Sequence, residues 1–183
     1  MSTPSTPPAS PAPSAVPSAD EELSALVEEA TKKSGLVWVN GQAVWHLWLD
    51  GGLHLVAGPG EQPVPDLVDG GTATVTVRSK DKGGRLVTWS ARVEVLAPHG
   101  EPWEAAVGEL KGKRLNAVDA ESVPSRWAAE CQVFRLAPTG SVPEHPGAMP
   151  DTSGAVAPVA TSATTRSPAP AGLPKLLARR RRT

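Results

Sequence analysis

The stretch TATVTVRSKDKGGRLVTWSARVEVL, residues 72–96, decides the fold. Apolar and polar residues alternate on both sides of a polar tip at 79–84 that contains two glycines. In the second half, the apolar face consists of Val87, Trp89, Ala91, Val93 and Val95. Alternation with a period of two, together with many β-branched residues, is typical of half-buried antiparallel strands. The stretch therefore predicts a long β-hairpin, which we place at the centre of a small β-barrel.

Shorter elements surround the hairpin. Tight-turn signals at Asn40-Gly41 and at 50–52 separate three runs of strand-forming residues. The strands predicted besides the hairpin are 36–40, 43–49, 53–57 and 131–137. Apolar residues at helical spacing predict helices at 20–33, 101–115 and 125–130, and a short turn of helix is expected at 66–69. The sequence thus predicts a mainly β fold, a six-stranded antiparallel barrel with flanking helices.

Composition divides the 183-residue chain into one domain and two tails. Residues 1–19 are rich in Pro, Ser and Ala, and residues 139–183 are rich in Pro, Ala, Thr and Ser. Neither segment can bury enough apolar surface to offset the entropy of ordering its backbone. We expect both tails to be disordered and residues 20–138 to form the domain.

Charge argues against a dedicated nucleic-acid-binding domain. The formal net charge of the chain is −1, and acidic and basic residues balance within the predicted domain. A nucleic-acid-binding domain would normally carry a basic face. The four arginines at 179–182 leave one alternative, in which a basic tail recruits the domain to nucleic acid.

Other simple signals exclude several classes of protein. No apolar run reaches membrane-spanning length and no secretory signal is recognisable, so a cytoplasmic location without membrane association is expected. Cys131 is the single cysteine, which excludes an intrachain disulfide and a multi-cysteine zinc site. We expect no metal.

Two segments are candidates for holding an anion. Gly58, Gly60 and Gln62 belong to the run GPGEQ, whose backbone N–H groups could face an anion with the Gln62 amide as a further donor. Arg78 and Lys80, near the hairpin tip, could hold a phosphate. Each segment also has a structural interpretation. The first would be a turn leaving the third strand, and the second a solvated tip that keeps a sheet edge soluble.

A third group of candidates is aromatic. His46 and Trp48 share one face of the predicted strand 43–49, and Trp89 lies on the apolar face of the hairpin. These side chains could contact a planar ring. The alternative is a satisfied barrel histidine with core or interface tryptophans. His54 could approach His46 from the neighbouring strand, and the sequence assigns no catalytic residue.

The order of the elements resembles the flavin-binding split barrel of the pyridoxamine 5′-phosphate oxidase-like superfamily. The matching stretches are LVWVNGQAVWHLWLDGGLHLVAG, VTVRSKDKGGRLVTWSARVEVLAP, EPWEAAVGELKGKRL and QVFRLAP. The resemblance implies an oxidoreductase-like protein, usually a homodimer, that binds FMN or the deazaflavin F420 at the subunit interface. The alternative is a cofactor-free dimeric barrel that acts as a binding or structural module.

The chain departs from this family after the third predicted strand. Members that bind FMN commonly carry Ser or Thr there, with a Lys or Arg that grips the phosphate. Glu61 lies in the corresponding stretch and would repel a phosphate. We expect Glu61 to point away, to pair with Arg78, Lys80 or Arg85, or to exclude the phosphate altogether. On this interpretation, Glu61→Lys strengthens FMN binding.

Overall fold

The computed structural model describes residues 17–64, 66–81, 83–114 and 121–151. Most of the two expected tails, including the four arginines at 179–182, lies outside the described residues. The chain divides into a unit of residues 1–149 and a second unit of residues 150–183, and the helices and strands below belong to the first. No helix of the described part combines the length and the apolar character of a membrane span.

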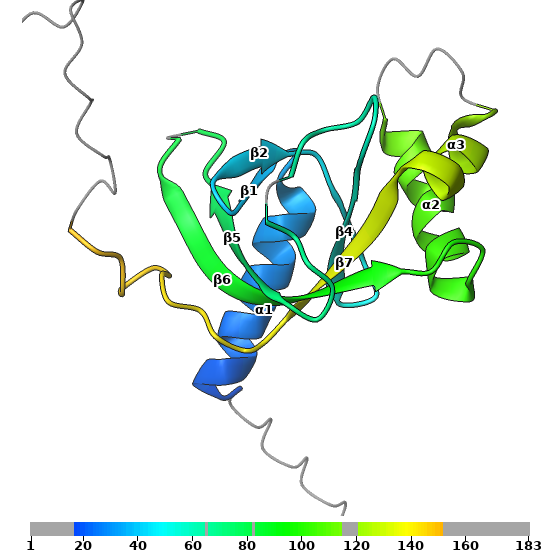
Figure 1. Ribbon diagram of the computed structural model, residues 1–183. Helices are drawn as coiled ribbons and strands as arrows, with labels where there is room; N and C mark the ends of the chain where they lie inside the picture. The colour runs from blue at the N-terminus through cyan, green and yellow to red at the C-terminus, as the bar shows by residue number, and fades with distance from the viewer. Residues whose placement is uncertain (1–16, 65, 82, 115–120, 152–183) are drawn as a thin grey trace, which may run out of the picture. The chain divides into compact units, whose positions relative to one another are not determined.

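The first unit is mainly β, a curled antiparallel half-barrel of seven strands with flanking helices (Figure 1). The strands are β1 (Val37–Val39), β2 (Gln42–Val44), β3 (Leu47–Leu49), β4 (Gly52–Ala57), β5 (Thr72–Arg78), β6 (Arg85–Leu96) and β7 (Gln132–Pro138). Their order in the sheet is β2-β1-β5-β6-β7-β4-β3. The predicted hairpin is confirmed as β5 and β6, which pair antiparallel from Thr72 opposite Arg92 to Arg78 opposite Arg85.

The predicted strand 43–49 forms two strands, because the chain changes partners at Trp45 and His46. β2 pairs with β1 and β3 pairs with β4, at opposite ends of the sheet. Since two residues join β2 to β3, the ends of the sheet must curl towards each other. At this junction of β2 and β3, here called the seam, the Gln62 amide takes the place of a neighbouring strand. Its Oε1 accepts from the Trp45 N–H at 2.8 Å, and its Nε2 donates to the Trp45 carbonyl at 2.9 Å.

The inner core fills the curled sheet. Leu55 of β4, Trp89 of β6 and Phe134 of β7 belong to it, and α1 (Ala19–Lys33) contributes Val27. The side chains of the hairpin that face inward are the ones that the alternation predicts. α1 packs against both β6 and β3, so it bridges strands that lie apart in the sheet order.

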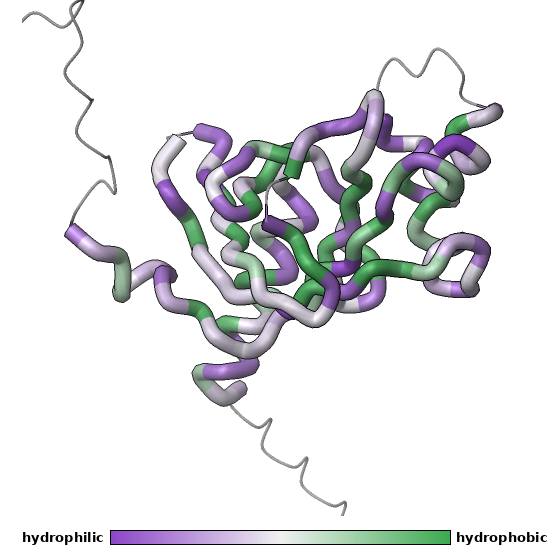
Figure 2. Tube along the Cα trace, viewed as in Figure 1, coloured by the Kyte–Doolittle hydropathy of each residue, from purple (hydrophilic) through white to green (hydrophobic). Residues whose placement is uncertain are grey.

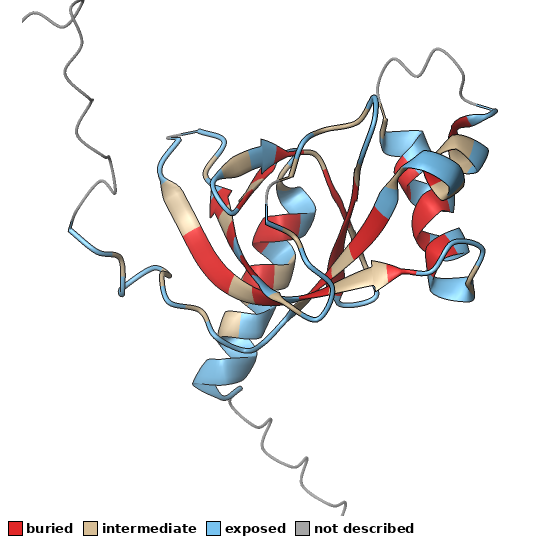
Figure 3. Cartoon of the chain, in the orientation of Figure 1, coloured by how far each residue is buried: buried red, intermediate tan, exposed pale blue. Residues whose placement is uncertain are grey.

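A second core lies on the outer face of β4 and β7, under α2 (Glu101–Lys113) and α3 (Val123–Glu130). Trp103 of α2 and Trp127 of α3 are its largest buried side chains. Figure 2 shows hydrophobic residues, and Figure 3 buried residues, along β4, β7 and these helices. Two cores in one chain explain the large number of tryptophans, so this number by itself does not argue for a homodimer.

The helices begin and end close to their predicted positions. Ser18 caps α1: its Oγ accepts from the Glu21 N–H, and the Glu21 carboxylate accepts from the Ser18 N–H at 2.7 Å. This reciprocal arrangement is the capping box, which satisfies backbone donors at the start of a helix. Pro102 lies in the first turn of α2, where its missing N–H is not needed.

Residues 66–69 do not form the expected turn of helix. The Asp69 carboxylate accepts from the Val95 N–H at 2.8 Å, and the Gly70 N–H donates to the Val93 carbonyl at 2.9 Å. Asp66 has a φ of +59°, outside the right-handed helical region. Pairing with β6 therefore prevails over the weak local helical signal.

Residues 139–144, here called the strap, extend the domain past its expected end at Pro138. β7 pairs with β6 only over residues 91–96. Beyond that point the backbone of the strap takes over, through bonds from the Thr139 N–H to Ser90, from the Ser90 N–H to Ser141 and from the Thr88 N–H to Glu144. The Glu144 carboxylate also accepts from Arg85 at 2.8 Å and from the Thr88 hydroxyl at 2.7 Å. The strap thus covers an edge of β6 that would otherwise be unpaired.

The seam predicts a specific stability defect. Gln62→Ala leaves the Trp45 N–H and carbonyl without their partners, so we expect the free energy of unfolding to fall by about 1–3 kcal/mol. Urea denaturation measures this loss. Gln42→Ala is the matched control, because the Gln42 amide reaches only the adjacent Ala43 carbonyl, at 3.4 Å. Its effect should stay within about 0.5 kcal/mol, and equal losses in the two variants would contradict the role of Gln62.

Candidate functional site

The eight residues predicted to bind a cofactor lie in separate places in the structure. Gly58, Gly60 and Gln62 are in the loop after β4, and Arg78 and Lys80 are at the tip of the β5–β6 hairpin. The three remaining residues are His46, Trp48 and Trp89, of which Trp48 and Trp89 share one cavity.

Glu61 lies at the centre of a hydrogen-bonded cluster of Glu61, Arg114, Arg126 and Trp127. The Glu61 side chain is 2% exposed. Arg114 Nε donates to both carboxylate oxygens at 2.9 Å, Arg126 donates at 2.6 Å, and the Trp127 indole N–H donates at 2.9 Å. Both arginines also bond to the loop backbone, at the Gly60 and Pro59 carbonyls. The cluster therefore ties the loop after β4 to α2 and α3.

These contacts correct the expected partners of Glu61. The carboxylate is buried and pairs with Arg114 and Arg126 instead of Arg78, Lys80 or Arg85. Burial raises the pKa of Glu61, and the hydrogen bonds from Arg114, Trp127 and Arg126 outweigh it, so the net pKa lies below its usual value. A lysine at this position would place a third cation against two arginines, so Glu61→Lys is now expected to destabilise the fold.

Glycine is required in this loop for packing. Gly58 has a φ of +149°, and a Cβ there would lie 2.8 Å from Cys131 Cα. Gly60 has a φ of +75°, which favours glycine. The Gln62 amide is engaged at the seam. A shallow cavity of about 650 Å³ adjoins the loop, and no Lys or Arg is among the described residues that line it. This arrangement does not fit a phosphate group.

Arg78 and Lys80 lie at the hairpin tip, on one flank of α1. Arg78 Nε donates to the Gly83 carbonyl at 2.7 Å, and the guanidinium lies 5.0 Å from the centre of the Trp38 ring. Both basic residues are exposed and line shallow depressions together with Lys33. The contacts of Arg78 therefore support the structure of the tip.

His46 and His54 are buried in the frame of the barrel, and the Nδ1 atom of each has no hydrogen-bond partner among the described residues. His46 Nε2 donates to the Thr31 carbonyl of α1 at 3.0 Å. His54 faces Leu47 across β3 and β4, so the sheet register does not set it opposite His46. Burial lowers the pKa of both imidazoles, with a backbone bond to Thr31 partly opposing the shift at His46 and with Arg135 adding to it at His54. Within the described residues, no group of three His, Cys, Asp or Glu side chains is arranged to hold a metal ion.

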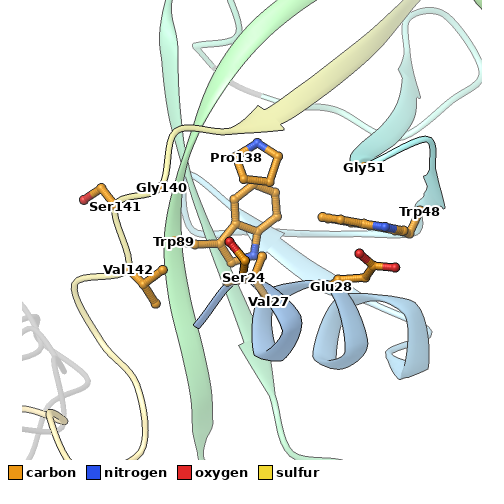
Figure 4. A pocket seen from close by; sticks show the side chains of 10 residues that line it. All are labelled: Ser24, Val27, Glu28, Trp48, Gly51, Trp89, Pro138, Gly140, Ser141 and Val142. Carbon is orange, nitrogen blue, oxygen red and sulfur yellow. The ribbon is translucent and has the colours of Figure 1, made fainter. Parts of the chain in front are cut away.

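Trp48 and Trp89 line a cavity of about 250 Å³, here called the tryptophan pocket (Figure 4). The two rings meet edge to face, with centroids 6.0 Å apart. One wall is α1, with Val27 and Glu28, and the strap forms another wall. Figure 4 shows the Trp89 ring near the centre of the view and the Trp48 ring to its right, with Glu28 below Trp48.

The tryptophan pocket has one unusual polar feature. The Trp89 indole N–H is buried and has no hydrogen-bond partner among the described residues, and Trp89 itself is fully buried. Buried polar groups are almost always paired, and an unpaired one is destabilising by about 1–3 kcal/mol. Trp89 thus lines the cavity and carries a buried hydrogen-bond donor that has no partner in the described part of the chain.

Comparison with known proteins yields only distant structural likenesses. No family model matches the sequence, and no curated protein matches it. The heme storage protein HutZ from Vibrio cholerae is 12% identical, with a TM-score of 0.46 over 63% of this chain and 89% of that one. An FAD and heme binding protein from Mycobacterium smegmatis is 16% identical, with a TM-score of 0.39 over 83% and 92%. An FAD-binding protein from Mesorhizobium loti is 13% identical, with a TM-score of 0.34 over 62% and 87%. Identities this low transfer no function to this chain.

The Glu61 cluster predicts an unequal response to two similar substitutions. Glu61→Gln leaves two arginines without their carboxylate, and we expect the free energy of unfolding to fall by about 2–3 kcal/mol. This is less than the roughly 3–5 kcal/mol of a fully buried pair, because the Arg114 and Arg126 side chains are 19% and 22% exposed. The control is Glu94→Gln, whose carboxylate pairs with Arg135 at the surface and is 47% exposed. Its effect should stay below about 1 kcal/mol, and similar losses in urea denaturation would refute the cluster's role.

The buried histidines predict a loss of stability in mild acid. Unfolded histidine titrates near pH 6.5, whereas the folded pKa values of His46 and His54 are lower. As the pH falls below about 6.5, the unfolded state takes up protons that the folded state resists, so the free energy of unfolding falls. Urea denaturation at pH 7.5, 6.5 and 5.5 measures the slope.

Substitution separates these histidines from other titrating groups. The double variant His46→Gln, His54→Gln should show a flatter slope. The control His99→Gln replaces a histidine whose side chain is 72% exposed, and it should keep the slope of the original protein. An unchanged slope in the double variant would exclude the two buried histidines as its cause.

Proposed function

We propose that this chain is a flavin-binding split-barrel protein whose tryptophan pocket receives the planar ring of the cofactor. The observation that carries the proposal is the unpartnered, buried N–H of Trp89, which lies beside the aromatic ring of Trp48. FMN and F420, the cofactors implied by the family resemblance, both present a tricyclic ring with hydrogen-bond acceptors along one edge. Such an edge would satisfy the Trp89 donor.

The size of the pocket supports one ring system. Its volume of about 250 Å³ exceeds the roughly 150 Å³ of an apolar cavity that holds benzene. It lies below the roughly 300–1,000 Å³ of clefts that enclose drug-sized ligands. Aromatic walls suit such a ligand, because ring pairs gain about 0.5–1.5 kcal/mol beyond the burial of their area. The remainder of a flavin would stay outside the pocket.

The residues that line the tryptophan pocket provide contacts for binding a ligand. A bound flavin would supply an acceptor for two electrons, and the oxidoreductase activity implied by the resemblance is part of this proposal. Glu28 is the ionisable group among the described lining residues, and its carboxylate is engaged by Lys32 one turn along α1. The roles that follow from the geometry are therefore a hydrogen bond from Trp89 and ring contact with Trp48.

A second candidate function is that of a cofactor-free binding or structural module. The family resemblance is compatible with this alternative, in which the barrel would be a dimer. The observation in its favour is the loop after β4, where Glu61 and Gln62 are engaged in holding the fold together. The absorbance spectrum of freshly purified protein, followed by titration with flavin, distinguishes the two candidates. Light scattering at micromolar concentration tests the dimer.

A pair of adjacent substitutions tests the pocket. Ser24 is exposed on α1 and lines the pocket, so Ser24→Leu places an apolar side chain in its mouth without disturbing the helix. We expect riboflavin affinity, measured by quenching of flavin fluorescence, to fall at least tenfold. The matched control is Ala25→Leu, which adds the same side chain at the next exposed position outside the pocket. Equal riboflavin affinity in both variants would show that the ring binds elsewhere.

A further inference from the structure

We infer that the tryptophan pocket recognises an uncharged ring and makes no favourable contact with a phosphate, so unphosphorylated flavins are its best flavin ligands. This inference rests on the proposed function and specifies the chemical class of the ligand. It differs from the expectation of FMN or F420, because each of these carries a phosphate in addition to its ring.

The first argument is the distribution of charge around α1. Ser24 and Glu28, four residues apart on α1, line the tryptophan pocket. Glu29 and Lys33, also four apart, lie on the other flank of the helix, towards the hairpin tip with Arg78. Residues four apart share a helix face, so each pair marks one face of α1 and the two pairs mark different faces. The helix therefore separates the pocket from the basic residues that were expected to hold a phosphate.

The second argument is the pocket's own charge. The described residues that line it include no Lys, Arg or His, and Glu28 is acidic. The nearest cation along α1, Lys32, forms an ion pair with Glu28. A phosphate reaching for Lys32 would have to displace this carboxylate and remain close to it. The rim of the pocket at α1 therefore opposes a dianion.

The third argument is the wall of the pocket that the strap forms. The strap contributes Gly140, Ser141 and Val142 to the pocket, none of which is charged. The charged group of the strap is Glu144, whose carboxylate is engaged by Arg85 and Thr88. A phosphate leaving the pocket along the strap would again meet an acid. The loop after β4, whose described lining residues include no Lys or Arg, does not fit a phosphate either.

Three ligands that share one ring test the inference. Lumiflavin has no ribityl chain, riboflavin has the chain, and FMN adds the phosphate. We expect lumiflavin and riboflavin to bind with affinities within about threefold, and FMN to bind no tighter than riboflavin. At low ionic strength, FMN should bind at least about threefold more weakly than riboflavin. Added salt should reduce this difference in affinity, because it screens the Glu28 carboxylate. Quenching of flavin fluorescence measures all three affinities.

Two variants test the charges directly. Glu28→Gln removes the carboxylate and releases Lys32, so the affinity for FMN should rise relative to that for riboflavin. In the double variant Arg78→Gln, Lys80→Gln, the ratio of the FMN and riboflavin affinities should not change. A selective loss of FMN binding there would show that these cations reach the phosphate, and it would overturn the inference.

The outcomes separate this inference from the proposal beneath it. If FMN binds more than threefold tighter than riboflavin to the original protein, the phosphate is recognised, and the inference fails while flavin binding stands. If none of the three flavins binds, the proposed function fails and the inference falls with it. A water molecule that accepts from the Trp89 N–H would then explain why this donor has no partner within the described chain.

Discussion

Glu61 and Gln62 are consecutive residues whose side chains hold two different parts of the fold together. The Gln62 amide pairs with the Trp45 peptide at the seam of the barrel, at 2.8 and 2.9 Å. The Glu61 carboxylate faces the other core, where two arginines and an indole from α2, α3 and their ends donate to it. The loop after β4 therefore links closure of the sheet to docking of the helices. Because the seam and the helices share this loop, the Glu61 carboxylate and the glycines of the loop serve to hold the fold together.

This structural role of the loop after β4 explains why the position expected for a cofactor phosphate does not suit a phosphate. A phosphate site needs unpaired N–H groups and a cation that is not already neutralised. Here Arg114 and Arg126 stabilise a buried carboxylate, and a side chain at Gly58 would collide with Cys131. An available polar group occurs elsewhere, at the Trp89 indole inside the sheet. The features that favour a ligand thus lie between α1 and the strap. Neither of these two segments belongs to the β5–β6 hairpin.

Part of the candidate site was predictable from sequence. Trp48 and Trp89 were candidates for contact with a planar ring, with core or interface packing as the alternative, and the structure brings them together in one cavity. The break at Trp45 and His46 was not predictable, because alternation runs through it without interruption. Nothing local shows that β2 and β3 have different partners. The role of Arg114 was also hidden, since a basic residue at a helix end is explained equally well by the helix dipole.

The sequence by itself determined the elements whose causes are local. The hairpin of β5 and β6 follows from alternation, and α1 follows from its apolar stripe, its Ser18 cap and its charged ends. The tertiary structure alone decided the seam, the Glu61 cluster and the tryptophan pocket. The seam and the Glu61 cluster join residues that lie 17 to 66 positions apart in the chain, and the tryptophan pocket brings Ser24 of α1 together with Val142 of the strap. A periodic pattern specifies which face of an element is buried, but it does not specify which distant donor will meet a buried carboxylate or which indole will be left without an acceptor.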